Sequence, residues 1–238
     1  MSTLTLIRHG QASFFDANYD QLSPLGERQM RLLGEYWVRS GVQYDEIFAG
    51  PRVRQRRSAE LAVATCRNAG KSYPEPVILE ELDEYDLRSL VHKLAPEFAK
   101  LNAAFAQSIE RHLSSNEEAR LAHFQGMFEP LLHHWQSISG DEVDMETWPA
   151  FRERVRNSIQ KLQQQNGKGR RIAFFTSGGF IGSAAQLALA APDRTALDLH
   201  WRLRNGSLTE FVFTSERFSL DTFNTVPHLE SAELLSYR

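Results

Sequence analysis

The sequence predicts an α/β fold, a three-layer α/β/α sandwich with a mostly parallel sheet and a helical cap insertion. Short apolar runs rich in β-branched residues alternate with segments of helical periodicity, as in parallel strands joined by crossover helices. Two of these runs stop at polar and glycine residues, which is typical of the ligand-binding edge of such a sheet. Residues 88–149 have helical character without a strand pattern, and we interpret them as a cap inserted into a single domain of residues 1–238.

The first strand is expected at residues 3–7 (TLTLI), and the polar residues 8–10 follow it directly. A helix is expected next, because Ser23 is a favourable N-cap and Pro24 suits the first helical position. Apolar residues then recur with mainly helical spacing. Gly41 is expected to end this helix.

The middle of the chain continues the alternation. Residues 44–48 (YDEIF) indicate a second strand, and residues 49–51 (AGP) a turn that leads into an alanine-rich helix. Residues 76–79 (PVIL) are a candidate third strand. The cap is expected to follow.

The last third of the chain repeats the opening pattern and then changes it. An amphipathic helix is predicted at residues 151–164 and a buried strand at residues 171–175. The strand is followed by Thr-Ser-Gly-Gly and by an alanine- and leucine-rich helix that runs to about residue 191. A hairpin is predicted from residues 208–213 and 218–223. The hairpin makes the predicted sheet mixed.

Composition excludes several classes of partner. The net charge of -3 gives no reason to expect nucleic acid or an anionic membrane as partner, and the longest apolar stretches are far shorter than the ~20 residues of a transmembrane helix. The first ten residues lack the basic and apolar regions of a signal peptide, and the lone Cys66 fits a reducing compartment, so we expect a cytoplasmic protein. No pattern specifies an oligomeric state.

Arg8, His9 and Gly10 follow the first strand and suit a phosphoryl group. An arginine binds phosphate oxygens in a bidentate manner, an imidazole can attack phosphorus, and glycine allows the backbone a close approach. A tripeptide alone is a weak signal, because an ordinary loop can contain it. A second cationic element elsewhere in the sequence would make the signal stronger.

Residues 51–59 (PRVRQRRSA) supply that element with four arginines in six residues at the start of a predicted helix. The helix dipole favours acidic residues there, so a basic start makes sense if an anion binds at the helix N-terminus beside an arginine. For Arg52, Arg56 and Arg57 taken singly, a solvated basic surface is the alternative interpretation.

Five segments of the chain, taken in their order along the sequence, resemble motifs of the histidine phosphatase superfamily, which has the phosphoglycerate mutase-like fold. The matching segments are Leu6-Ile7-Arg8-His9-Gly10-Gln11-Ala12-Ser13, Leu22-Ser23-Pro24-Leu25-Gly26-Glu27-Arg28-Gln29, Pro51 to Ala59, Leu82-Asp83-Glu84 and Arg204-Asn205-Gly206-Ser207. They cover both halves of the chain, with the cap between them. Together the five segments point to this family much more specifically than any single segment does.

The resemblance implies a role for each matched residue. His9 would be the nucleophile that forms a phosphohistidine, and Arg8, Gly10 and Arg54 would bind the phosphoryl group of a small phosphorylated substrate. Glu84 would act as general acid and base, with Glu81 as the alternative. No metal and no cofactor are expected, because the arginines supply the positive charge.

One position departs from the family pattern. Ser177 stands where a second phosphate-binding histidine is expected, and Gly178 follows it with a backbone amide that can also face phosphate. A serine hydroxyl can donate a hydrogen bond but has no charge. A cap histidine could fill the gap, and the candidates are His92, His112, His123, His133 and His134.

These observations leave three functions open. The leading one is a metal-independent, histidine acid-type phosphatase, that is, a phosphoric monoester hydrolase. A phosphoglycerate mutase-like phosphotransferase is the nearest alternative. The third is a phosphate-binding regulatory domain whose activity Ser177 has weakened. Neither a P-loop nor a dinucleotide-binding glycine motif occurs.

Overall fold

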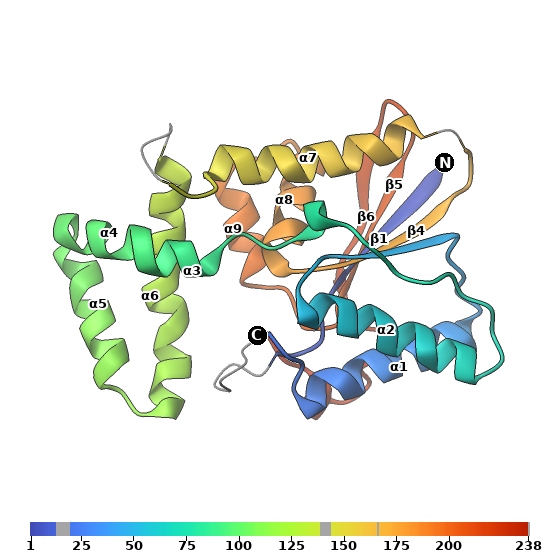
Figure 1. The fold of residues 1–238 in the computed structure, drawn as a ribbon, viewed down its shortest axis with the longest axis horizontal. Helices are drawn as coiled ribbons and strands as arrows, with labels where there is room; N and C mark the ends of the chain where they lie inside the picture. The colour runs from blue at the N-terminus through green and yellow to red at the C-terminus, as the bar shows by residue number, and fades with distance from the viewer. Residues whose placement is uncertain (13–19, 139–143, 166, 238) are drawn as a thin grey trace. The chain divides into compact units, whose positions relative to one another are not determined.

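The computed structural model describes residues 1–12, 20–138, 144–165 and 167–237 and shows an α/β protein built on one six-stranded sheet (Figure 1). The chain divides into two compact units. One, here called the sheet unit, comprises Met1–Glu84 and Val155–Arg238, and the other, the helical unit, comprises Tyr85–Arg154. The predicted α/β class with a mostly parallel sheet is confirmed. Ser13, the last residue of the first family motif, lies outside the described residues.

The sheet has the strand order β3-β2-β4-β1-β5-β6, and β5 runs in the direction opposite to that of the other five strands. Its strands are β1 Ser2–Arg8, β2 Glu46–Ala49, β3 Val77–Ile78, β4 Arg171–Thr176, β5 Leu208–Phe213 and β6 Phe218–Thr225. The central strands β1 and β4 pair in parallel, with Arg8 opposite Thr176. The residues that follow these two strands, His9 and Ser177, therefore lie at the same edge of the sheet.

Helices cover both faces of the sheet, which completes the three layers (Figure 1). α1 (Pro24–Ser40) and α2 (Val53–Asn68) pack on one face, where Trp37 and Phe175 belong to a single apolar core with Ile7. On the other face lie α8 (Gly178–Ala188) and residues 155–164 of α7 (Trp148–Gln164). A short helix, α9 (Arg194–His200), packs on α8.

The helical unit consists of α3 (Leu87–Ser89), a π-helical turn at Leu90–Leu94, α4 (Ala95–Leu101), α5 (Ala103–Ser114), α6 (Glu117–Ser137) and the start of α7. Its core is aromatic. Phe128, Trp135, Trp148 and Phe151 are almost fully buried there, and Tyr85 packs against two of them. These rings therefore stabilise this unit by packing against one another.

Local signals in the sequence give both ends of α1 correctly. The Ser23 hydroxyl accepts a hydrogen bond from the Gly26 amide, Pro24 begins α1, and Gly41 ends it with a φ of 65°. The third strand is shorter than predicted and contains only Val77 and Ile78. Pro76 has no amide hydrogen to contribute to a ladder, and Leu79 is already the N-cap of a 3-10 helix at Glu80–Leu82. α9 was not predicted at all. No helix in the described residues is long and apolar enough to cross a membrane.

Candidate active site

The backbone on either side of His9 is fixed by the sheet and by the turn before β5. The His9 amide donates to the Thr176 carbonyl over 3.0 Å, and the Gly206 amide donates to the His9 carbonyl over 3.2 Å. Gly206 has a φ of 73°, a left-handed conformation that favours glycine. The imidazole therefore projects from a rigid position at the end of β1.

The hydrogen bonds of the His9 ring define its tautomer. Nδ1 lies 2.7 Å from the Gly10 carbonyl oxygen, which can only accept, so Nδ1 carries the ring proton. Nε2 then has a lone pair, and it accepts a hydrogen bond of 3.2 Å from Nε of Arg54. A neutral imidazole with a lone pair on Nε2 is the form of histidine that can attack phosphorus.

Burial and two cations keep this ring neutral. The pKa of His9 lies well below its usual value, first because the ring is buried and then because the charges of Arg54 and Arg8 oppose protonation. The bond to the Gly10 carbonyl acts in the opposite direction and is the smaller effect. The neutral form of His9, with a lone pair on Nε2, is thus favoured at neutral and mildly acidic pH.

Gly10 is required by a close approach between two backbone segments. A Cβ atom on Gly10 would lie 2.4 Å from the Gly26 carbonyl oxygen, so the start of α1 leaves no room for a side chain. The Gly10 amide donates to the Ser58 hydroxyl over 3.1 Å, and that hydroxyl donates to the Arg54 carbonyl. This contact connects the segment after β1 to α2.

Arg54, in the first turn of α2, is buried and paired with a carboxylate. Its Nη1 donates to Oδ1 of Asp20 over 2.8 Å, and Oδ2 of Asp20 accepts from the Val53 amide over 2.8 Å. The anion expected at this helix N-terminus is therefore a side chain of the protein itself in this structure. The same pair of donors would suit a phosphate group that displaced it.

Arg8 is also buried, and its guanidinium is held by carbonyl groups. Nη1 donates to the Leu203 carbonyl and, over 3.3 Å, to the Tyr237 carbonyl. Its charge lowers the pKa of both His9 and His200. Arg8 therefore contributes positive potential at the edge of the sheet where His9 lies.

Glu84 and Glu81, the two alternatives for the acid, lie in different surroundings. Glu84 is buried, and its Oε2 accepts a hydrogen bond of 2.9 Å from the Gly179 amide in the first turn of α8. Glu81 is partly exposed and forms an ion pair with Lys161. The geometry favours Glu84, because its carboxylate reaches the helix that follows β4, the strand beside His9.

Ser177 is buried, and its hydroxyl oxygen accepts a hydrogen bond of 2.8 Å from Nε2 of Gln55. The next residue, Gly178, has an unexpected neighbour. A Cβ atom built on Gly178 would lie 2.8 Å from Nδ1 of His200, so the ring lies directly against this glycine. His200 was not among the predicted site residues, because the short helix that presents it was not predicted.

The other arginines near the start of α2 have individual partners or face solvent. Nε of Arg52 donates to Asp83 over 2.6 Å, and Arg57 pairs with Glu27. Arg56 is exposed. The surface interpretation thus fits Arg56, whereas Arg52 stabilises the segment that carries Glu84.

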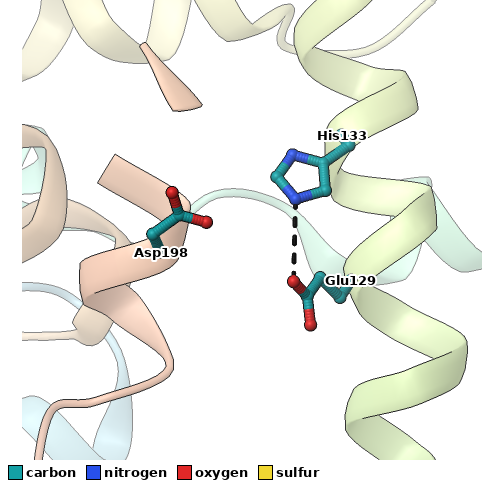
Figure 2. A group of neighbouring side chains, drawn as sticks. All are labelled: Glu129, His133 and Asp198. Carbon is teal, nitrogen blue, oxygen red and sulfur yellow. Dashed lines mark ion pairs between the residues drawn. The ribbon is translucent and has the colours of Figure 1, made fainter. Parts of the chain in front are cut away.

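The five cap histidines that are candidates to replace the missing histidine all belong to the helical unit. One of them, His133, has Nε2 3.8 Å from Oε1 of Glu129, one turn earlier on α6 (Figure 2). Asp198, also drawn in Figure 2, belongs to α9 of the sheet unit and lies 3.8 Å from Arg194 on the same helix. Two side chains on one helix do not complete a metal site, which takes three or four protein ligands.

A model of a known protein family matches most of the chain. Residues 4–128 and 108–226 match the family model of the histidine phosphatase superfamily, branch 1. No protein of curated function matches the sequence. The two matched stretches include the segments that contain Arg8, His9, Arg54 and Glu84 and the segment around Ser177.

Solved structures show the same fold at low sequence identity. A phosphoserine phosphatase mutant from Entamoeba histolytica, in complex with phosphoserine, is 20% identical with a TM-score of 0.60, and the match covers 96% of this chain and 100% of that one. Phosphoglycerate mutase from Bacillus anthracis is 14% identical with a TM-score of 0.62, covering 96% and 95%. A putative α-ribazole-5'-P phosphatase from Escherichia coli is 18% identical with a TM-score of 0.58, covering 94% and 98%. Because the family model matches both halves of the chain and the fold agrees, the protein belongs to the histidine phosphatase superfamily, branch 1.

Proposed function

We propose that this protein is a metal-independent phosphatase that hydrolyses a small phosphate monoester through a phosphohistidine on His9. The observation that carries this proposal is the state of the His9 ring. Its Nδ1 is held by the Gly10 carbonyl, and its Nε2 presents a lone pair to the buried cation of Arg54. A nucleophile and a phosphate-binding group are thus already in contact.

In the first step, Nε2 of His9 attacks phosphorus in line with the ester oxygen. The new N–P bond forms as the P–O bond to the alcohol breaks, and Glu84 in its protonated form gives a proton to the leaving alkoxide. Arg54 and Arg8 stabilise the charge on the phosphoryl oxygens. For this step, the Arg54 guanidinium must move its hydrogen bonds from His9 and Asp20 to the phosphate.

In the second step, water attacks the phosphohistidine. Glu84, now ionised, takes a proton from the water, and the N–P bond breaks so that its electron pair returns to Nε2. Inorganic phosphate leaves, and His9 and Glu84 regain their starting protonation states. Arginine side chains thus supply the positive charge in both proposed steps.

Two alternatives use the same binding site. A phosphotransferase of the mutase type would pass the phosphoryl group to a second hydroxyl group instead of water. A phosphate-binding domain with weakened catalysis is favoured by one observation, the uncharged Ser177 hydroxyl already bonded to Gln55. The products separate the three functions: a phosphatase releases inorganic phosphate, a mutase transfers the phosphoryl group to a hydroxyl group, and a binding domain forms little of either product.

The test is a hydrolysis assay with EDTA present on phosphoserine, 3-phosphoglycerate, α-ribazole phosphate and p-nitrophenyl phosphate. The wild type is expected to release phosphate from at least one of them, and His9→Ala to lose at least about a thousandfold of that rate. His228→Ala, which removes another buried imidazole of the sheet unit, is the control and should retain the activity. Phosphate that stabilises the wild type against heat without any turnover would favour the binding domain, and transfer between positions of phosphoglycerate would favour the mutase.

A further inference from the structure

His200, the last residue of α9, lies beside the proposed phosphate site in the same compact unit as His9. Its ring packs on Gly178, with Nδ1 at 2.8 Å and Cε1 at 3.0 Å from the place a Cβ atom would occupy. Any side chain at position 178 would therefore displace the imidazole. The first residue of α8 and the last residue of α9 fit together only because position 178 is glycine.

A second glycine fixes the approach of the two helices. A Cβ atom on Gly182, one turn further along α8, would lie 2.3 Å from the Ala196 carbonyl oxygen of α9. The two helices touch backbone to backbone along this face, and Ala196 and Leu197 are buried. The position of His200 is therefore set by close packing and not by a mobile surface segment.

The electrostatic surroundings place the ring among the phosphate-binding groups. Burial, followed by the charge of Arg8, lowers the pKa of His200 to about 3, while a hydrogen bond to the Gly178 backbone acts in the opposite direction. His200 also contributes to the lowered pKa of His9. The ring thus lies within electrostatic range of both Arg8 and His9, at the N-terminus of α8, which favours anions.

We propose that His200 is a substrate-binding residue whose imidazole donates an N–H hydrogen bond to the phosphoryl group held at Arg8, His9 and the start of α8. The inference deepens the proposed function and rests on it for the identity of the ligand. It also compensates for the serine at position 177, where the family pattern has a histidine, because an imidazole from another helix supplies a donor where this chain has only a hydroxyl. Burial and then the Arg8 charge keep the free ring neutral, with its one ring proton donated to the Gly178 backbone. A bound phosphate dianion offsets the Arg8 charge, so the ring takes up a second proton from solvent together with the ligand, and that N–H is the one donated to the phosphoryl group.

Binding of inorganic phosphate to the full chain, measured by calorimetry at pH 7, tests this inference without requiring turnover. His200→Ala is expected to weaken phosphate binding by about 10- to 100-fold, the loss of one hydrogen bond to a charged group. The matched control is His228→Ala, which removes a buried imidazole from the same unit and should change the Kd less than about twofold. A folded His200→Ala protein that binds phosphate as tightly as the wild type would overturn the inference.

Two further measurements remain decisive if His200→Ala does not fold. In the wild type, the ring resonances of His200 should shift on saturation with phosphate or vanadate, whereas those of His228 should not. Gly178→Ala, which pushes the ring away, should weaken phosphate binding by a similar factor. An unshifted His200 resonance at saturation would refute the inference, because a ring bonded to the ligand must report it.

The same experiments distinguish this inference from the proposed function. His9→Ala removes the nucleophile but leaves His200 in place, so this variant should still bind phosphate and still show the His200 shift. If the wild type shows no turnover yet the His200 shift occurs, the phosphatase proposal fails and the binding role of His200 stands. If turnover occurs and His200→Ala binds phosphate normally, the phosphatase proposal stands and the binding role of His200 fails.

Discussion

Arg54 donates a hydrogen bond from Nε to Nε2 of His9 across 3.2 Å, so the proposed nucleophilic atom is in direct contact with a buried cation. The same guanidinium donates from Nη1 to Asp20. In the absence of substrate, the cation is thus shared between the nucleophile and a carboxylate. Under the proposed function a phosphoryl group replaces both contacts, and the predictions for Arg54 and Asp20 follow from that exchange.

Arg54→Lys should lower kcat/KM by about 100- to 1,000-fold, the usual effect of removing one preorganised donor from a transition state. Lysine keeps the charge but cannot bind two phosphoryl oxygens through a planar fork. Steady-state hydrolysis of p-nitrophenyl phosphate measures the effect. Arg56→Lys, on the exposed side of the same helix, is the control, and its kcat/KM should equal that of the wild type. Equal activities of the two variants would remove Arg54 from the mechanism.

Asp20→Asn should strengthen the binding of inorganic phosphate by about two- to fivefold, the effect of removing one partly exposed ion pair. The Asp20 carboxylate accepts from both the Val53 amide and Arg54, so it competes for the donors that phosphate would use. Calorimetric titration with phosphate measures the change. Asp45→Asn, which removes a carboxylate that accepts from the Arg171 amide at the opposite edge of the sheet, is the control. Weaker binding in Asp20→Asn would show that this carboxylate orients Arg54 instead of competing with the ligand.

Gly10→Ala should destabilise the fold by roughly 1–3 kcal/mol, because its Cβ atom would meet the Gly26 carbonyl oxygen at 2.4 Å and the backbone would have to shift. Gly126→Ala should do the opposite. Gly126 is an exposed position within α6 with nothing near its Cβ direction, and alanine there should stabilise by about 0.5–1 kcal/mol. Urea unfolding of both variants checks the two signs. A neutral Gly10→Ala variant would contradict the close approach.

The free energy of unfolding should fall as the pH drops below about 6.5. Burial lowers the pKa of His228 to about 4 in the folded protein, so between these values the unfolded chain binds a proton that the folded protein does not. This histidine alone should cost about 1–2 kcal/mol between pH 6.5 and pH 5. His9 and His200 act in the same direction. Urea unfolding at several pH values should give a shallower slope for His228→Ala than for the wild type, and parallel curves would refute the burial of this ring in its neutral form.

Features determined by short segments could be predicted from the sequence. Ser23, Pro24 and Gly41 bound α1 as expected, because capping depends on residues within one turn of the helix end. The place of Arg54 was predicted for a similar reason, since the first turn of α2 follows directly from the turn after β2. The roles of His9, Arg8, Gly10, Arg54, Glu84, Ser177 and Gly178 in binding and catalysis remain predictions.

Features that depend on tertiary contacts could not be predicted. α9 has only seven residues, and its packing depends on two glycines of α8, so no periodicity in its own sequence indicated it. His200 was missed with it. Glycines four residues apart at positions 178 and 182 were the available signal, but they indicate close packing without naming the partner. The contact of Asp20 with Arg54 spans 34 positions and likewise leaves no local pattern.

Rapid-quench trapping of the phosphoenzyme tests the central claim most directly. The wild type, mixed with a 32P-labelled phosphate monoester that it hydrolyses and quenched in base, should carry label that is stable to base and released by acid, as expected for phosphohistidine. His9→Ala should carry none under the same conditions. Hydrolysis by the wild type without any acid-labile phosphoenzyme, or equal labelling of His9→Ala, would contradict the account.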